Sequence, residues 1–187
     1  SAVRLRIGGR TVTIGGMAKG VGMISPNLAT MLCFISTDAV IEYTALNKAL
    51  KDAVDSSFNR ISVDGDMSTN DTVIIMANGE AGNKTISSGS PALRKFSGAL
   101  STLTMTLARK IVSDGEGATR VVEVEVKGAA NQKDAYSVAR QIENSPLVKT
   151  MLTGADPNWG RIAGACGAAD ADVRENRLDI SICGYNV

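Results

Sequence analysis

The residues best suited to chemistry lie in residues 16–39, where Lys19 stands in a glycine-rich segment ahead of the neighbours Ala29 and Thr30. An apolar, β-prone run follows directly, so the Thr30 hydroxyl would lie at the first residue of a buried strand. Cutting the bond between Ala29 and Thr30 would give Thr30 a free amine next to its own hydroxyl, and that amine could act as its base. A self-cleaving precursor would need this layout.

Histidine is absent from the 187 residues, and this absence narrows the chemistry. It removes Ser-His-Asp and Cys-His catalysis within the chain and nearly every catalytic zinc site. The three cysteines, Cys33, Cys166 and Cys183, are scattered and odd in number, which favours a reducing compartment and small buried thiols over disulfides or a metal site. We therefore expect no metal, and a nucleophile whose base is not a histidine.

Charge and hydropathy exclude two broad classes of function. The net charge is +1 and no basic cluster is present, so binding to nucleic acid has no electrostatic support. No apolar run approaches the roughly 20 residues of a membrane span, and no signal peptide is visible. We therefore expect a cytoplasmic protein that binds neither nucleic acid nor membranes.

Two charged residues, Lys19 and Glu116, are surrounded by small residues and could contact a ligand. Glu116 is flanked by a glycine on each side, after a predicted helix and before a predicted strand. Each residue also has an ordinary interpretation, Lys19 as a solvated surface lysine and Glu116 as a solvated acid in the turn that ends a helix. Residues 64–72, rich in Asp, Asn, Ser and Thr, are either a tight structural turn or a functional loop. Spacing alone leaves these alternatives open.

The elements that must position these residues follow from periodicity and turn signals. Alternating residues on either side of Gly8-Gly9 predict a hairpin. Expected strands cover residues 3–7, 10–14, 30–36, 61–63, 73–77, 121–127 and 177–183. The second strand is expected to end at Gly15-Gly16, which leaves Lys19 in a loop.

Apolar stripes at steps of three and four residues predict helices. Expected helices begin after Thr44, at Ser90-Pro91 and after Asn131, with shorter ones at residues 147–152 and 162–169. One stripe, formed by Leu46, Leu50, Val54 and Phe58, is expected to face a sheet. The order of elements predicts an α/β chain in which a mixed sheet is layered with helices.

Four motifs in this sequence resemble the glutamate N-acetyltransferase / ornithine acetyltransferase family. They are K-G-V-G-M-I-S-P-N-L-A-T-M-L (residues 19–32), S-V-D-G-D-M-S-T-N-D-T (62–72), E-G-A-T-R (116–120) and G-A-D-P-N-W-G-R (154–161). The resemblance implies an N-terminal-nucleophile-like αββα architecture of the DmpA/ornithine acetyltransferase type, incomplete here. It also implies that residues 1–29 end the family's first chain and that residues 30–187 form its second chain, truncated at the C-terminus.

The family resemblance also assigns roles to residues. Members cut themselves between an alanine and a threonine, which match Ala29 and Thr30, and the new terminal threonine is the catalytic nucleophile. The matching substrate contacts are Lys19, Thr30 and Glu116. The implied reaction, part of arginine biosynthesis, moves an acetyl group from N2-acetylornithine to glutamate through an acetyl-threonine intermediate. No cofactor is implied, although some members accept acetyl-CoA as a substrate, and the cut halves stay together and assemble further.

This sequence departs from the family pattern at both ends, and the departures keep other functions open. The family's first half is much longer than 29 residues and supplies a Thr-Gly pair as oxyanion hole, and its second half continues beyond the position of Val187. The resemblance therefore implies little or no activity for this chain alone. Two alternatives are a self-processing N-terminal-nucleophile amidohydrolase or aminopeptidase, and an inactive fragment that needs a missing partner segment.

Overall fold

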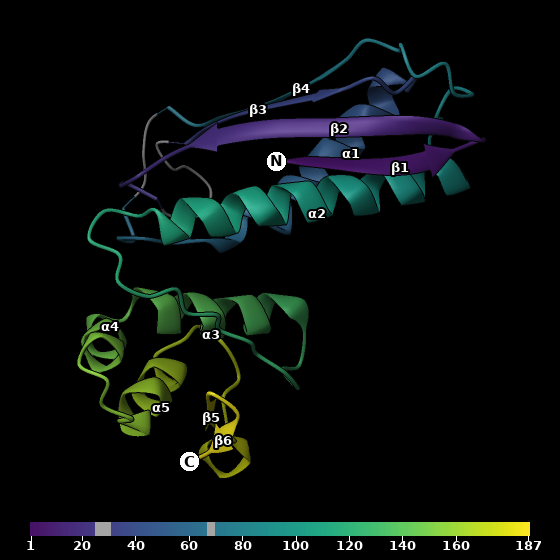
Figure 1. The fold of residues 1–187 in the computed structure, drawn as a ribbon. Coiled ribbons are helices and arrows are strands. Elements are labelled where there is room, and N and C mark those ends of the chain that lie inside the picture. Colours follow the sequence, from purple (N-terminus) through teal and green to yellow (C-terminus); the bar gives the residue numbers. More distant parts are fainter. Residues whose placement is uncertain (25–30, 67–69) are drawn as a thin grey trace. The chain divides into compact units, whose positions relative to one another are not determined.

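The computed structural model describes residues 1–24, 31–66 and 70–187, and the chain divides into two compact units, Ser1–Ala118 and Thr119–Val187 (Figure 1). Each unit has a hydrophobic core of its own. The chain boundary expected between residues 29 and 30 lies inside the first unit, at residues outside the described part. That boundary stays a prediction.

The first unit is built on a four-stranded sheet with the strand order β1-β2-β3-β4. The strands are β1 (Ala2–Ile7), β2 (Arg10–Lys19), β3 (Leu32–Thr37) and β4 (Thr72–Ala77). β2 is antiparallel to both β1 and β3, whereas β3 and β4 run parallel. In the β1–β2 turn, Gly8 and Gly9 have positive φ values of 57° and 82°, as a two-residue hairpin of this hand requires. The predicted mixed sheet is confirmed.

Two helices, α1 (Tyr43–Asp55) and α2 (Pro91–Ser113), cover one face of this sheet (Figure 1). α2 packs on β1 and β2, and α1 packs on α2. The predicted start of α2 is confirmed, because Ser90 Oγ accepts a hydrogen bond from the Leu93 N–H at 3.1 Å and Pro91 is the first helical residue. Phe96, Leu100 and Leu103 on α2 are fully buried and form the centre of the core.

The apolar stripe predicted on α1 lies beside the face that the helix buries. The residues of α1 that are fully shielded are the alanines, Ala45, Ala49 and Ala53. Leu46, Leu50 and Val54 are only partly buried and pack against the edge of the core, and Phe58 is buried beyond the helix in a 3₁₀ turn. α1 packs directly on α2, and small buried side chains allow packed helices to approach closely.

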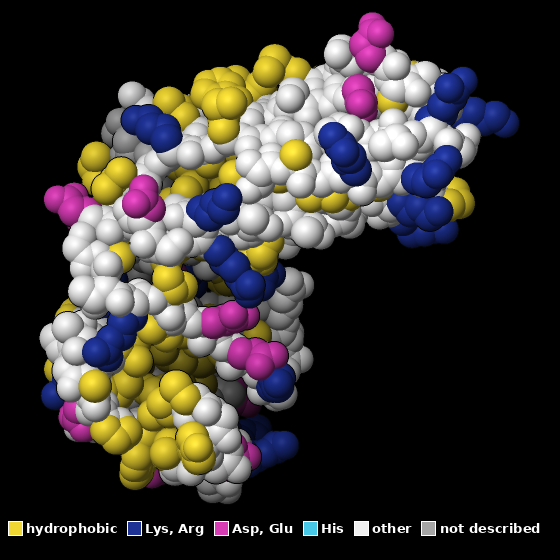
Figure 2. Space-filling view, viewed as in Figure 1, with side chains coloured by type: hydrophobic (Ala, Val, Ile, Leu, Met, Phe, Trp, Pro, Cys, Tyr) yellow, Lys and Arg dark blue, Asp and Glu magenta, His cyan; other side chains and the backbone are white. Residues whose placement is uncertain are grey.

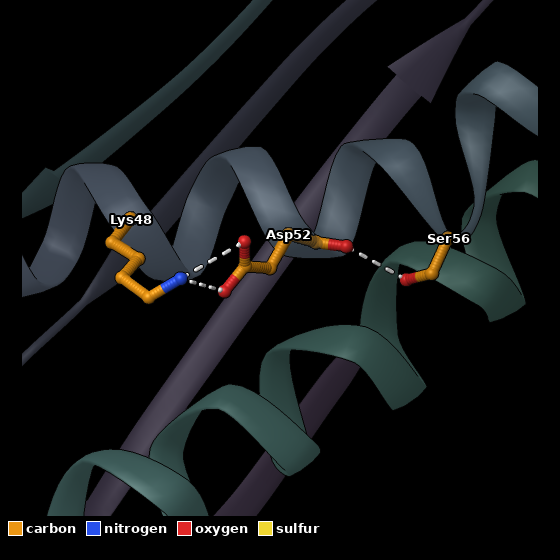
Figure 3. A network of polar contacts seen from close by, with 3 residues as sticks. All are labelled: Lys48, Asp52 and Ser56. Carbon is orange, nitrogen blue, oxygen red and sulfur yellow. Dashed lines mark hydrogen bonds and ion pairs between the residues drawn. The ribbon is translucent and has the colours of Figure 1, made fainter. Parts of the chain in front are cut away.

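α1 carries a small polar network of three residues (Figure 3). Lys48 Nζ lies 3.0 Å from Asp52 Oδ2, one helical turn away, and the Ser56 hydroxyl donates to the Asp52 backbone carbonyl at 2.9 Å. Both charged side chains are largely exposed, and such pairs contribute little to stability. This network lies on the surface, and its three residues do not form a catalytic site.

The face of the sheet opposite the helices is apolar and exposed. Because neighbouring residues of a strand point to opposite faces, Cys33 and Ile35 face the core while Phe34 faces outward. Four large apolar side chains of this face are between 40% and 71% exposed, namely Met17, Phe34, Ile74 and Met76. Figure 2 shows hydrophobic side chains gathered over the sheet of the first unit.

The second unit consists of short helices around a small core. Its elements are α3 (Gln132–Asn144), α4 (Pro146–Thr153), α5 (Trp159–Gly167), η2 (Glu175–Arg177), β5 (Ser181–Ile182) and β6 (Tyr185–Asn186). The core is formed by Val138, Ile142, Val148, Met151, Ala165 and Cys166. The predicted helix start at Asn131 is confirmed, since its side chain accepts a hydrogen bond from the Asp134 N–H at 2.9 Å.

Two strand predictions are wrong, and a third strand is shorter than predicted. Residues 121–127 alternate as a strand would, but they form no strand. In place of a paired strand, Val124 and Val126 pack against the helical core of the second unit. Residues 61–63 form no strand, although the Val63 N–H donates a hydrogen bond to the Ile24 carbonyl at 2.9 Å. The strand expected at residues 177–183 shortens to β5. Alternation indicates a segment with one buried side and one exposed side, but a strand also needs a neighbour for its hydrogen bonds.

Candidate active site

Lys19 is the last residue of β2, not a loop residue as the sequence predicted. The strand continues through Gly15-Gly16 because these residues pair with Ser36 and Ile35 of β3. Lys19 pairs in turn with Leu32, the first residue of β3, and its side chain is exposed. The pairing places Lys19 beside the strand that begins two residues after Thr30.

Glu116 follows α2 and returns to the segment that begins with Lys19. Its N–H donates a hydrogen bond to the Val21 carbonyl at 2.8 Å. Its carboxylate lies against Gly22, because a Cβ added at Gly22 would come 3.3 Å from Glu116 Oε2. The absence of a side chain at Gly22 therefore makes room for this carboxylate. Two of the three predicted substrate contacts, Lys19 and Glu116, are almost a hundred positions apart in the sequence and flank one short segment of chain.

Asp64 holds the next part of the same segment, and sequence reasoning did not single it out. Asp64 Oδ2 accepts a hydrogen bond from the Met23 N–H at 2.6 Å, and Oδ1 accepts one from the Ile24 N–H at 3.1 Å. A Cβ at Gly22 would also lie 3.6 Å from Asp64 Oδ2. Of the two alternatives for residues 64–72, this contact supports a structural role, because Asp64 binds the chain that leads to Ala29.

Asp71 binds the chain on the other side of the predicted cleavage point. Its Oδ1 accepts a hydrogen bond from the Met31 N–H at 2.9 Å, and the Thr72 N–H donates to the Met31 carbonyl at 3.0 Å. Burial raises the pKa of the Asp71 carboxyl, and the hydrogen bond from Met31 acts in the opposite direction. Its position ahead of a predicted strand was visible in the sequence, but its partner was not.

Ala29 and Thr30 lie outside the described residues, so the nucleophile and the cleavage site stay predictions. Within the described residues, no cluster of three or more acidic or cysteine side chains could hold a metal ion. Burial raises the pKa of the Cys33 thiol to about 11, which keeps this neighbour of the site protonated and unreactive. None of the helices in the described residues is long and apolar enough to span a bilayer.

The arrangement suits a ligand that carries both a carboxylate and an amine. Lys19 supplies a cation and belongs to the segment ahead of the predicted nucleophile. Glu116 supplies an anion and contacts that segment. Charge-assisted hydrogen bonds of this kind are stronger than neutral ones and fix the orientation of a ligand. An amino acid or its derivative has the complementary pair of groups.

The sequence model of the ArgJ family matches residues 1–187. The arginine biosynthesis bifunctional protein ArgJ of Symbiobacterium thermophilum is 53% identical over 96% of this chain and 45% of its own length. The protein of that name from Bacillus subtilis is 51% identical over 96% of this chain and 44% of its own length. The chain thus spans less than half the length of these relatives.

A solved structure agrees with these sequence relatives. The crystal structure of the arginine biosynthesis bifunctional protein ArgJ from Bacillus halodurans superposes with a TM-score of 0.79 at 47% identity. The match covers 82% of this chain and 72% of that chain. The family model matches the whole chain, the relatives are about 50% identical to it, and the fold is shared. The chain therefore belongs to the ArgJ family.

Proposed function

We propose that this chain carries the nucleophile of an acetyl transfer from N2-acetylornithine to glutamate. The reaction is a step of arginine biosynthesis and takes place in the cytoplasm. The observation that carries the proposal is that Glu116 contacts Val21 and Gly22, just after Lys19, in the segment that leads to the pair Ala29 and Thr30. Relatives at 51–53% identity are named arginine biosynthesis bifunctional proteins, which supports it.

The proposed reaction begins after cleavage between Ala29 and Thr30. The free α-amine of Thr30 takes the proton of the Thr30 hydroxyl while the oxygen attacks the acetyl carbonyl of N2-acetylornithine. The bond between the acetyl carbon and the ornithine nitrogen then breaks, the same proton passes to that nitrogen, and ornithine leaves. In the second half, the amine of glutamate attacks the acetyl-threonine ester, and Thr30 regains its hydroxyl proton.

Lys19 and Glu116 have complementary roles in this scheme. The Lys19 ammonium pairs with the α-carboxylate of the substrate, and the Glu116 carboxylate holds an amino group. The chemistry uses groups of the chain itself and the two substrates, so it requires no cofactor. Acetyl-CoA would serve, in the same scheme, as another acetyl donor to Thr30.

Trapping the acetyl group on Thr30 tests the proposal directly. The complete protein that contains residues 1–187 is incubated with N2-acetylornithine alone, digested and analysed by mass spectrometry. We expect one acetyl group on the peptide that begins with Thr30, and its loss when glutamate is added. Continuous release of acetate without glutamate would contradict transfer and favour the amidohydrolase.

Removing either charge of the pair is expected to weaken substrate binding. For Lys19→Met or Glu116→Gln, the KM for the amino-acid substrates should rise about 10- to 100-fold, the worth of a hydrogen bond to a charged group. Steady-state kinetics measures this change, and intact mass shows whether cleavage still occurs. The control is Lys48→Met, which removes an exposed lysine from α1 and should leave KM unchanged. An unaltered KM in both site variants would remove them from the binding site.

A further inference from the structure

The Asp64 carboxylate joins its own turn to residues 21–24, a segment that belongs to no helix or strand. Asp64 Oδ2 accepts the Met23 N–H at 2.6 Å, and Oδ1 accepts the Ile24 N–H at 3.1 Å. Oδ1 also accepts the Asp66 N–H at 3.1 Å, which holds the carboxylate in one orientation. Hydrogen bonds to a charged acceptor are stronger than neutral ones, so this carboxylate fixes the backbone of residues 23 and 24.

The backbone of Met23 is held in an unusual conformation. Its φ is 51°, in the left-handed region that residues with a side chain rarely adopt. Met23 is 50% exposed, so burial of its side chain does not impose this conformation. The short hydrogen bond from its N–H to Asp64 does. Backbone strain of this kind persists where the surrounding structure enforces it, and it is concentrated at functional sites.

Gly22 borders the carboxylates of both Asp64 and Glu116. A Cβ added at Gly22 would come 3.6 Å from Asp64 Oδ2 and 3.3 Å from Glu116 Oε2. The Glu116 N–H donates to the Val21 carbonyl at 2.8 Å, so the backbone and the side chain of Glu116 both contact this segment. The place of the Glu116 carboxylate therefore depends on the path of residues 21–24.

We propose that Asp64 is a positioning residue for Glu116, an inference that rests on the proposed function. Asp64 fixes residues 23 and 24, these set the place of Gly22, and Gly22 sets where the Glu116 carboxylate lies. The carboxylate then meets the amino group of the substrate on the same segment that Lys19 begins. Asp64 acts through Glu116 and does not bind the substrate, because both of its oxygens accept backbone N–H groups.

A double-mutant cycle between Asp64 and Glu116 tests this role in the complete protein. Asp64→Asn keeps only one oxygen for N–H groups that now use two, so we expect KM for the amino-acid substrates to rise about 10-fold. The value of kcat should change by less than about 3-fold, because the lost interaction serves binding. In a Glu116→Gln background, Asp64→Asn should raise KM by less than about 2-fold, since residues that act through one another are not additive.

Two further measurements keep the cycle independent of folding and of turnover. Gly22→Ala leaves the hydrogen bonds of Asp64 in place and puts a methyl group against Glu116 Oε2, so KM should rise about 3-fold, again only when Glu116 is present. Titration calorimetry with ornithine, which receives no acetyl group from a protein without a donor, repeats the cycle as a dissociation constant. Thermal unfolding verifies that each variant is folded.

The matched control is Asp38→Asn, at the other end of β3. Asp38 Oδ1 likewise accepts a backbone N–H, that of Thr13, at 2.7 Å, so this variant loses a comparable interaction and should leave KM and the dissociation constant unchanged. Equal effects of Asp64→Asn with and without Glu116, or no effect in either background, would overturn the proposal. A protein that shows the expected cycle in calorimetry but takes no acetyl group on Thr30 would instead overturn the proposed transfer, while the role of Asp64 would stand.

Discussion

Thr30→Ala is expected to leave the complete protein in one piece and to lower acetyl transfer by at least about 1,000-fold. The methyl group of alanine can neither attack the Ala29 carbonyl nor hold an acetyl group, and removing a nucleophile typically costs several orders of magnitude in rate. Intact mass reports cleavage, and the formation of N-acetylglutamate from N2-acetylornithine reports transfer. The two measurements test two uses of one hydroxyl group.

Two further variants make the Thr30 result decisive. Thr30→Ser keeps a hydroxyl and, after cleavage, a free amine, so it should be cut and should retain measurable transfer. Thr102→Ala changes an exposed threonine of α2, whose hydroxyl donates to the Gly98 carbonyl of its own helix, and should match the wild type. A Thr30→Ala protein with wild-type turnover would disprove the proposed nucleophile.

Phe96→Ala is expected to lower the free energy of unfolding by about 3–5 kcal/mol. Phe96 is fully buried in the core between α2 and the sheet, and truncating a buried phenylalanine loses both its transfer free energy and the packing around the cavity that remains. Urea unfolding of the whole chain, followed by circular dichroism, measures the change. A loss of this size removes much of the stability of an ordinary domain.

The neighbouring residue on α2 provides the control for Phe96. Lys95 is exposed, and Lys95→Ala keeps the helix while leaving the core intact, so its effect should stay within about 0.5 kcal/mol. Equal effects of the two variants would mean that the core of the first unit does not depend on α2.

Features that depend on near neighbours in the chain could be predicted from the sequence. Ser90 and Pro91 start a helix because a hydroxyl three residues before a free N–H can cap it, and no distant residue is needed. Gly8-Gly9 makes a hairpin turn because only the backbone of these residues must adopt positive φ. The mixed sheet and its helices followed from such local signals.

Features that depend on distant partners could not be predicted in this way. The alternation in residues 121–127 is real, but the second unit offers it a helical core in place of a neighbouring strand. α1 buries its alanines in the core that it shares with α2, and the sequence of α1 alone does not predict that contact. Pairing across the sheet likewise extends β2 as far as Lys19.

The same distinction between local features and distant partners applies to the candidate site. The Ala29 and Thr30 pair and the two isolated charges were visible as residue types, and the family resemblance supplied their roles. The carboxylates of Asp64 and Asp71 bind backbone groups about 40 positions away, so their roles appear only in the folded chain. The sequence showed these residues as turn formers, which is the ordinary use of aspartate ahead of a strand.

The place of β2 in the sheet has a consequence for the order in which the protein can mature. β2 lies between β1 and β3, and its side chains Val12 and Ile14 are fully buried. A cut after residue 29 would leave this interior strand on a separate polypeptide, held only by noncovalent contacts. Refolding of the denatured cut protein would then be bimolecular and slow on dilution, whereas the uncut chain would refold at a rate independent of concentration. Folding must therefore precede cleavage, and cleavage makes it hard to reverse.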